Sequence, residues 1–444
     1  MQVYKFGGTS VGMPERMHKV SSLILSDKEP KIVVLSAVSG TTNALVEIGE
    51  LLVLRKQQEA QAKGAALKMH YDDFVEELYA TPVGKQKGNE LVERLFTDIN
   101  ALMHIPDFNH GNNKTLLAYG EILSTNLFHH YLRESGVSNI LLPALEFMSI
   151  DENGEPEIEE ISKKLKSLIN SADKVPIYIT QGFICRNHEG KTDNLQRGGS
   201  DYTASIIGAA IAADEVQIWT DIDGMHNNDP RVVKNTFPIA ELTFDEAAEL
   251  AYFGAKILHP SSILPAQKYG IPVRLKSTID QAAQGTVISN ITGAGDIKAI
   301  AAKDDITAIK IKSSRMLLAH GFLRQIFEIF EKYKTSIDMV TTSEVAVSVT
   351  IDEPRHLVPI VEELKRFGVV EVDKNQTIIC MVGSMLTEKK GVLKRIFDAL
   401  ETVPVRMVSY GGSKNNLSLL VDTKYKEEAL CTLNESVFEK ERQL

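Results

Sequence analysis

The tail of the chain repeats itself, and this internal repeat constrains the fold more than any other feature of the sequence. At an offset of 70 residues, the helical pattern that begins at Gly321 matches the one that begins at Gly391, and the strand around Ile351 matches the one around Val421. Agreement across a helix and a strand at one spacing indicates two copies of one structural unit. The tail is therefore expected to hold two small domains of the same fold.

Each copy reads as strand, helix, strand, strand, helix. In the first copy these elements are expected at 307–311, 321–333, 336–341, 345–351 and 356–367. In the first copy, the helix at 321–333 places Phe322 and Ile326 on one broad face, as packing on a sheet requires, and a strand at 369–373 completes a ferredoxin-like βαββαβ order. No strand remains to complete the second copy. We therefore expect the apolar run 297–302 to complete the second sheet, with the first copy inserted in the second.

The chain before the repeat alternates short apolar, β-branched runs with helical patterns. Such alternation is typical of parallel strands that are covered by helices on both faces. The runs that read as strands are 31–36, 140–142, 175–181 and 215–220. The sequence thus predicts an α/β fold: a mostly parallel central sheet flanked by helices, followed by two ferredoxin-like domains.

Two segments interrupt this alternation. Residues 43–104 are rich in helical patterns, including 51–69 and 89–103, and read as a helical side subdomain. Residues 280–297 carry glycines among small polar residues, the composition of a connection between domains. The predicted domain limits are 1–295 for the large domain, 305–374 for the first small domain, and 297–304 with 375–444 for the second.

Charge and hydropathy exclude several classes of partner. Lys and Arg total 49 against 59 Asp and Glu, a net charge of -10, which argues against nucleic acid and anionic lipid. The longest nearly uncharged run of small and apolar residues, 202–213, is shorter than the roughly 20 residues that cross a bilayer. The start MQVYKFGG lacks the apolar stretch of an export signal. These features favour a cytoplasmic protein without nucleic-acid or membrane partners.

The first chemical motif is Lys5 with the glycine pair Gly7-Gly8, directly after a strand predicted at 2–4. Paired glycines let backbone amides approach an anion, and the lysine adds a mobile positive charge for phosphate oxygens. The lysine precedes the glycines, so the motif is not the P-loop pattern. A tight turn without a ligand is the alternative interpretation.

A second motif, Arg197 to Asp201, precedes a small-residue helix predicted at 202–213. Backbone amides at a helix start favour an anion, and Arg197 adds a fork for carboxylate or phosphate; Asp201 acting only as an N-cap is the alternative. A third motif runs from Thr220-Asp221 to Arg231, at the carboxyl end of a strand where α/β folds bind ligands. Its glycine and proline are also compatible with simple turns.

Taken together, these motifs resemble those of the aspartokinases in the amino-acid kinase superfamily, and the tail resembles paired ACT domains. The resemblance covers essentially the whole chain and rests on KFGGTSVG (5–12), LSAVSGTTN (35–43), YGEILS (119–124), QGFI (181–184), RGGSDYTA (197–204), WTDIDG (219–224), NDPRVV (228–233) and FGAKILHP (253–260). It implies phosphorylation of the β-carboxylate of L-aspartate by Mg-ATP to give 4-phospho-L-aspartate, the first step towards lysine, threonine and methionine.

The resemblance also implies roles for individual residues. Lys5 and Asp201 are the catalytic pair, with Lys5 on the transferring phosphoryl group and Asp201 orienting it. The implied ATP contacts are Lys5, Gly7, Gly8, Thr220, Asp221, His226, Arg231 and Lys256. The implied aspartate contacts are Ser36, Thr42, Glu121, Phe183, Arg197, Gly198, Gly199 and Ser200. His226 replaces a frequent tyrosine, which leaves the adenine contact open, and Mg²⁺ is expected mainly on phosphate oxygens and water.

The tail resembles the effector site of lysine-sensitive aspartokinases. The matching residues are Met316, Ala319, Gly321, Phe322, Leu323, Ser336, Ile337, Asp338, Thr342, Ser343 and Glu344. Asp338 and Glu344 supply negative charge for ammonium groups; the alternative is a solvated loop over core side chains. Ala319 stands where a lysine-inhibited relative has serine, so threonine remains an open alternative to lysine. The resemblance further implies a homodimer through the ACT domains, with tetramers left open.

Two other functions are alternatives to the phosphorylation of aspartate. Another kinase of the superfamily, acting on acetylglutamate, glutamate or carbamate, shares the fold but generally lacks the paired ACT tail. A non-catalytic amino-acid sensor is the second alternative, and intact Lys5, Arg197 and Asp201 argue against it.

Overall fold

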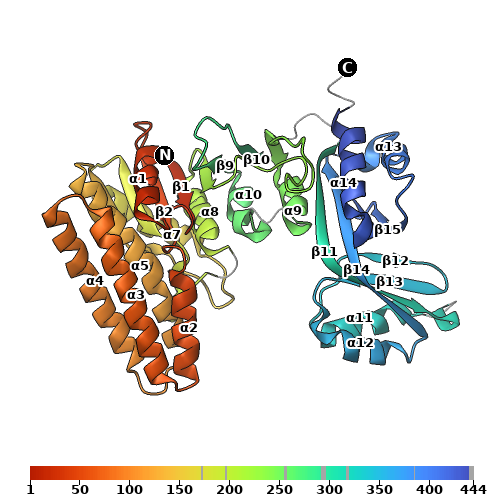
Figure 1. Cartoon of the computed structure of the whole chain (residues 1–444), viewed down its shortest axis with the longest axis horizontal. Helices are drawn as coiled ribbons and strands as arrows, with labels where there is room; N and C mark the ends of the chain where they lie inside the picture. Colours follow the sequence, from red (N-terminus) through yellow and green to blue (C-terminus); the bar gives the residue numbers. More distant parts are fainter. Residues whose placement is uncertain are drawn as a thin grey trace. The chain divides into compact units, whose positions relative to one another are not determined.

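The computed structural model describes two compact units (Figure 1). The described residues are 1–171, 174–195, 198–254, 258–291, 297–316, 320–384 and 386–439. The first unit comprises Met1–Met225, Ala240–Phe244 and Leu258–Ile291, and the second comprises His226–Ile239, Asp245–Ile257 and Thr292–Leu444. No helix within the described ranges is long and apolar enough to cross a membrane.

The first unit is built on an eight-stranded sheet with the order β3-β4-β2-β1-β7-β9-β10-β8. Its strands are β1 (Gln2–Phe6), β2 (Lys31–Leu35), β3 (Asn139–Leu142), β4 (Ile177–Gln181), β7 (Val216–Thr220), β8 (Glu241–Thr243), β9 (Val273–Ser277) and β10 (Thr286–Ser289). All neighbouring pairs are parallel except β9 and β10. The predicted α/β class with a mostly parallel sheet is confirmed. Strand β10, however, lies inside 280–297, which was wrongly predicted to be only a connection.

Helices cover this sheet, and four of them lie side by side (Figure 1). The helices of the unit are α1 (Pro14–Ile24), α2 (Thr41–Val53), α3 (Gln57–Leu78), α4 (Pro82–Met103), α5 (His110–Glu134), α6 (Ala144–Phe147), α7 (Ile158–Ser171), α8 (Gly199–Ile211) and α10 (Leu264–Tyr269). Helices α2 to α5 form the side-by-side group. The predicted helix 51–69 is wrong, because the chain breaks between α2 and α3, where Arg55 adopts a φ of 59°. No proline or glycine marks that break in the sequence.

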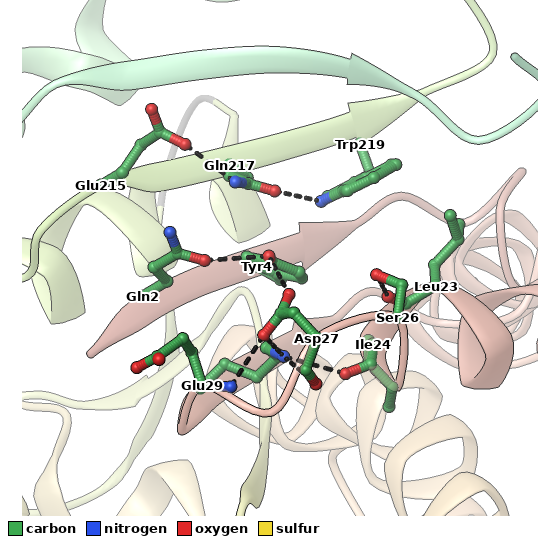
Figure 2. Close-up of polar contacts among 11 residues, drawn as sticks. Gln2, Tyr4, Leu23, Ile24, Ser26, Asp27, Glu29, Glu215, Gln217 and Trp219 are labelled. Atoms are coloured by element: carbon green, nitrogen blue, oxygen red, sulfur yellow. Dashed lines mark hydrogen bonds and ion pairs between the residues drawn. The ribbon is translucent and has the colours of Figure 1, made fainter. Parts of the chain in front are cut away.

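A buried lysine ties the end of α1 to the start of the sheet. The Lys31 ammonium, only 1% exposed, donates to the Ile24 carbonyl at 2.9 Å and to Asp27 Oδ1 at 2.7 Å. Figure 2 shows the Tyr4 hydroxyl pointing at Asp27, to which it donates at 3.3 Å. Although burial opposes the effect, the hydrogen bond from Lys31 lowers the pKa of Asp27. The cluster thereby holds β1, the strand that carries Lys5, against α1 and β2.

The second unit contains a six-stranded sheet with the order β12-β13-β11-β14-β16-β15. Its strands are β11 (Ile297–Lys312), β12 (Val340–Thr342), β13 (Ala346–Ile351), β14 (Val369–Gly383), β15 (Val405–Tyr410) and β16 (Asn416–Asp422). Its main helices are α11 (Phe322–Lys332), α12 (Leu357–Leu364), α13 (Val392–Ala399) and α14 (Lys426–Asn434). The long antiparallel pair β11 and β14 runs through both repeat copies (Figure 1).

Strand β11 serves both copies along its length. Residues 307–312 pair with β13 of the first copy, whereas 297–303 pair with 378–383 of β14. Residues 376–382 of β14 pair in turn with β16 of the second copy. The sequence predicts separate strands at 297–302 and 307–311. They form one strand because a register shift between Lys303 and Ile306, with Asp305 at a φ of 62°, absorbs the polar residues that read as a loop. Strand β12 begins at Val340, later than the predicted strand, so Ser336 to Asp338 precede it.

Two segments from the middle of the chain pack into the second unit. Val233 lies in the hydrophobic cluster of the second copy, and the ring of Phe237 packs edge-on against Phe438 with centroids 5.8 Å apart. Helix α9 (Phe244–Tyr252) contributes its residues from Asp245 onward to the same unit. Core packing of the tail thus includes residues near the predicted nucleotide motif.

Candidate active site

Lys5 and Asp201 form an ion pair at the carboxyl edge of the sheet. The Lys5 ammonium lies 2.6 Å from Asp201 Oδ1, with the side chains 12% and 15% exposed. Asp201 lies in the first turn of α8, and the N-cap of that helix is Gly198, with a φ of 71°. The predicted helix start at 202 and the interpretation of Asp201 as an N-cap are therefore wrong. The left-handed Gly198 lets the helix begin earlier than its glycines suggested.

The glycine turn after β1 packs tightly against the turn after β2. A Cβ on Gly8 would lie 3.0 Å from the Ala37 carbonyl oxygen, and a Cβ on Gly12 would lie 2.8 Å from Ser39 Cβ. A Cβ on Gly7 would approach the Lys5 ammonium to 3.3 Å. Side chains at these positions would separate the two turns or press on the ammonium. The glycines therefore keep the backbone close to the positive charge.

Hydroxyl groups join the ends of β2 and α8. Ser36 Oγ donates to Ser200 Oγ at 2.9 Å, and Ser124 Oγ donates to the Ser36 carbonyl at 2.8 Å. A Cβ on Gly182, just after β4, would lie 2.4 Å from Ser200 Oγ. Four segments far apart in sequence therefore meet at the carboxyl edge of the sheet, where parallel α/β folds bind ligands.

Glu121 on α5 is a buried carboxyl group beside these hydroxyls. Its Oε1 accepts the Ala37 N–H at 3.2 Å, whereas Oε2 is buried without a hydrogen-bond partner among the described residues. Burial raises the pKa of Glu121 to about 8. An unsatisfied acceptor of this kind fits a ligand ammonium group, which would restore the charged form. Thr42, in the first turn of α2, is half-buried.

Phe183, between β4 and β5, is held in a strained backbone conformation against the first turns of α8. Its φ is 67°, its N–H donates to Thr203 Oγ1 at 2.9 Å, and its carbonyl accepts the Leu195 N–H at 2.7 Å. A Cβ on Gly199 would lie 2.5 Å from the Phe183 ring. Left-handed φ values in bulky residues are costly and persist only where the surroundings impose them. Phe183 is thus a fixed wall beside Ser200.

Sequence reasoning missed some residues that organise this region. Thr203 bonds the Phe183 N–H, and its place four residues after Gly199 on the helix could have suggested it. Ser124 could likewise have been suggested, because it lies three residues after Glu121 and therefore on the same face of the helix. Lys114 pairs with Asp193 at 2.6 Å and ties α5 to the hairpin of β5 (Ile184–Arg186) and β6 (Thr192–Asn194). No local sequence signal indicated that pair.

The predicted nucleotide residues belong to both units. In the first unit, Thr220 Oγ1 donates to Asp221 Oδ1 at 3.1 Å at the end of β7. In the second, His226 Nδ1 lies 3.0 Å from Thr236 Oγ1. The Arg231 guanidinium is 84% exposed and bonds both oxygens of Asp229, at 2.9 and 2.8 Å.

Three predicted site residues, Arg197, Lys256 and Ala319, lie outside the described residues.

The predicted effector residues divide into a packed and an exposed group. Met316, Phe322 and Ile337 belong to or pack on the hydrophobic cluster of the first copy. The exposed group comprises Leu323, Ser336, Thr342, Ser343 and Glu344. The Asp338 side chain differs from both groups, because it is fully buried and paired with Lys303 at 3.0 Å.

Comparisons with known proteins extend over the whole chain. Residues 1–277 match the amino acid kinase family, and residues 379–437 match an ACT domain. The lysine-sensitive aspartokinase 3 of Escherichia coli is 35% identical over 98% of this chain and 99% of its own length. Crystal structures of E. coli aspartokinase III superpose with TM-scores of 0.85 for its complex with lysine and aspartate and 0.79 for its complex with aspartate and ADP, at 35% identity. They cover 99% of this chain, and 99% and 100% of the respective structures.

Proposed function

The chain belongs to the aspartokinase family, and on this premise we propose that it transfers the γ-phosphoryl group of Mg-ATP to the β-carboxylate of L-aspartate. The products are ADP and 4-phospho-L-aspartate. As an aspartokinase, the chain is a phosphotransferase with a carboxyl group as acceptor. The observation that carries the proposal is the Lys5–Asp201 pair beside the Gly7-Gly8 turn, with the buried Glu121 hydrogen-bonded to the turn after β2.

The reaction needs positive charge more than it needs a base. The attacking β-carboxylate is already ionised at neutral pH, so an oxygen–phosphorus bond forms and the bond to ADP breaks without a proton transfer. The barrier lies in bringing two anions together in line. Asp201 holds the Lys5 ammonium at a fixed position, from which it neutralises charge on the transferring phosphoryl group.

Different protein groups are assigned to the ammonium group and to the carboxylates of the substrate aspartate. We assign the ammonium of the substrate to Glu121, whose buried Oε2 is available as an acceptor. Ser36 and Ser200 supply hydroxyl groups, and Phe183 forms a wall. The carboxylate clamp assigned to Arg197, with Gly198 and Gly199, and the contact assigned to Thr42 rest on the family resemblance.

Nucleotide binding is assigned to the glycine turn and to the loops that follow β7. By the family resemblance, Gly7 and Gly8 are assigned to the phosphates, and Thr220, Asp221, His226, Arg231 and Lys256 to the rest of the nucleotide. Mg²⁺ enters with ATP as part of the substrate, mainly on phosphate oxygens and water, because Mg²⁺ retains several waters.

Regulation is assigned to the repeated tail. We propose that lysine inhibits the enzyme by binding at the first ACT copy, 305–374, and that 297–304 with 375–444 form the second copy. The strand pairing of 297–303 with 378–383 supports this division. Assembly of a homodimer through the ACT sheets is part of the same proposal, with threonine as the alternative effector.

A hydroxamate assay tests the activity directly. The enzyme is incubated with Mg-ATP, hydroxylamine and one of aspartate, glutamate or acetylglutamate, and acyl hydroxamate is measured with and without lysine and threonine. We expect turnover with aspartate and inhibition by lysine. Faster turnover with glutamate or acetylglutamate would contradict the proposed substrate.

A further inference from the structure

The Asp338 carboxylate, which is assigned to an effector's ammonium, is already occupied from within the chain. Its side chain is 0% exposed, and Oδ1 accepts the Lys303 ammonium at 3.0 Å and the Tyr252 hydroxyl at 2.7 Å. Oδ2 is buried and lacks a hydrogen-bond partner among the described residues. A ligand can therefore reach this carboxylate only if a group that covers it moves.

Lys303 is shared between two carboxylates. At the register shift of β11, its ammonium lies 2.8 Å from Asp352 as well as 3.0 Å from Asp338, and 4.3 Å from the centre of the Tyr252 ring. Burial works against this ammonium, yet hydrogen bonds to Asp352 and Asp338 raise the pKa of Lys303. Among the described residues, the two carboxylates share this one ammonium, which leaves one negative charge without a paired cation. The cluster is therefore suited to accept one more cation.

Tyr252 links this cluster to a predicted nucleotide residue. It is the last residue of α9, and two positions later Gly254 adopts a φ of 133°, where a Cβ would lie 2.3 Å from the Ala302 carbonyl oxygen. The chain from Tyr252 to Gly254 thus lies directly on β11, next to Lys303. Lys256, assigned to the nucleotide phosphates, follows Tyr252 by four positions.

The start of the same segment is held separately by the second copy. Glu246 accepts the Lys298 ammonium at 2.8 Å and the Ser384 hydroxyl at 2.7 Å, and its side chain is only 1% exposed. The segment 245–254 is therefore anchored at both ends. Only the anchor at Tyr252 depends on the carboxylate assigned to the effector.

We propose that Tyr252 and Lys303 belong to the effector site and that the effector's ammonium competes with them for Asp338. Binding of a cationic amino acid then releases the Tyr252 hydroxyl and frees the end of the segment 245–254, which precedes Lys256 in the sequence. The inference rests on the proposed regulation by an amino acid. The inference assigns the coupling between the effector site and the segment before Lys256 to one hydrogen bond, from the Tyr252 hydroxyl to Asp338.

Two variants of the full-length enzyme test the competition. Tyr252→Phe removes the hydroxyl and keeps the ring, and Lys303→Met removes the ammonium and keeps the stem. The matched controls in the second copy are Tyr410→Phe, whose hydroxyl donates to the Leu386 carbonyl at 3.1 Å, and Lys426→Met, whose ammonium pairs with Asp304 at 2.5 Å. The effector used is lysine or threonine, depending on which one inhibits the wild type, and calorimetry gives its dissociation constant. Activity at saturating effector is divided by each variant's own uninhibited rate.

Competition predicts that the dissociation constant of the effector falls while the fraction of activity left at saturating effector rises. In Tyr252→Phe the effector should bind about tenfold more tightly, because a hydrogen bond to a charged group no longer has to break, while more activity should remain at saturation. Lys303→Met should also bind the effector more tightly, since the effector becomes the counter-ion of both carboxylates. Both controls should match the wild type.

The outcomes separate the two levels of the proposal. A wild type that binds and is inhibited, beside a folded Tyr252→Phe variant with the same dissociation constant and residual activity, overturns the inference alone. Weaker binding in Lys303→Met likewise contradicts competition, because it would make Lys303 a supporting residue. A wild type that binds neither lysine nor threonine overturns the effector site and the inference with it.

Discussion

The hydroxyl of Ser36 donates a hydrogen bond to the hydroxyl of Ser200 at 2.9 Å, across 164 positions of the chain. The contact joins the turn after β2 to the first turn of α8, the two places where the family resemblance locates aspartate contacts. If both hydroxyls bind the same substrate, their effects on aspartate affinity should be coupled.

A double-mutant cycle tests this coupling. Ser36→Ala and Ser200→Ala should each weaken aspartate binding several-fold, and the double variant should lose less than the two single losses combined, by about 0.5–1.5 kcal/mol. Calorimetry without ATP gives the aspartate dissociation constants of the wild type, the two single variants and the double variant. Strict additivity would show that the two hydroxyls act on aspartate independently.

Removing the central positive charge should abolish most of the activity. Lys5→Ala is expected to lower turnover about a hundredfold or more, since one preorganised electrostatic donor contributes about 2.7–4 kcal/mol in known enzymes. Asp201→Asn should retain the fold but lose part of that rate, because the ammonium is no longer fixed. Lys63→Ala, which removes an exposed pair with Glu47, is the control. Near-normal turnover in Lys5→Ala would refute the catalytic assignment.

The sequence indicated which glycine turns and charged residues the fold brings together more reliably than it indicated the limits of the helices and strands around them. The Lys5 glycine turn and the segment at Gly198 to Asp201 could be predicted because local glycines and charges define such sites. The continuity of β11 past Lys303 depends on pairing with β14, about 75 residues away, and β10 is held partly by pairing with the distant β8, which no short window contains. The break at Arg55 and the Lys303–Asp338 pair are likewise set by tertiary packing.

The pKa of Glu121 makes aspartate binding pH-dependent. Because burial raises this pKa to about 8, the empty site is protonated at neutral pH and must release a proton to accept an ammonium group. The dissociation constant for aspartate should fall as pH rises from about 6.5 to 8.5, approaching tenfold per unit below the pKa. Calorimetry in two buffers of different ionisation enthalpy should show the released proton. In Glu121→Gln the release should vanish.

The same group should affect stability with a defined sign. The folded, empty enzyme holds the Glu121 proton between its ordinary pKa of 4.5 and about 8, whereas the unfolded chain does not. The folded state therefore binds more protons in this window, so the contribution of Glu121 to the free energy of unfolding falls as pH rises through it. The melting temperature of Glu121→Gln should therefore rise relative to that of the wild type as the pH increases from 5 to 8. An unchanged difference across that range would contradict the raised pKa.

Close packing at Gly182 should make this position intolerant of a methyl group. A Cβ there would lie 2.4 Å from Ser200 Oγ and 2.9 Å from Ser200 Cα, and the latter atom belongs to the backbone. Gly182→Ala should lower kcat/KM for aspartate by about tenfold or more, from overpacking of roughly 1–3 kcal/mol. Gly412→Ala, where nothing lies within 4 Å of the added carbon, is the matched control. Equal activity in both variants would show that Ser200 can move without consequence.

The buried Lys31 should stabilise the first unit through the end of α1. Lys31→Met keeps the apolar stem but removes the ammonium that bonds the Ile24 carbonyl and Asp27, so the melting temperature should drop by several degrees, from a loss of about 1–3 kcal/mol. Since the pKa of Asp27 is lowered in the fold, its contribution to stability is present above 3.8 and lost as pH falls, and the difference between the enzymes should shrink in acid. Lys63→Met, at an exposed pair, should change the melting temperature little. A wild-type melting temperature in Lys31→Met would mean that the methionine packs as well as the bonded lysine, and the cluster at Asp27 would then contribute nothing to the position of β1.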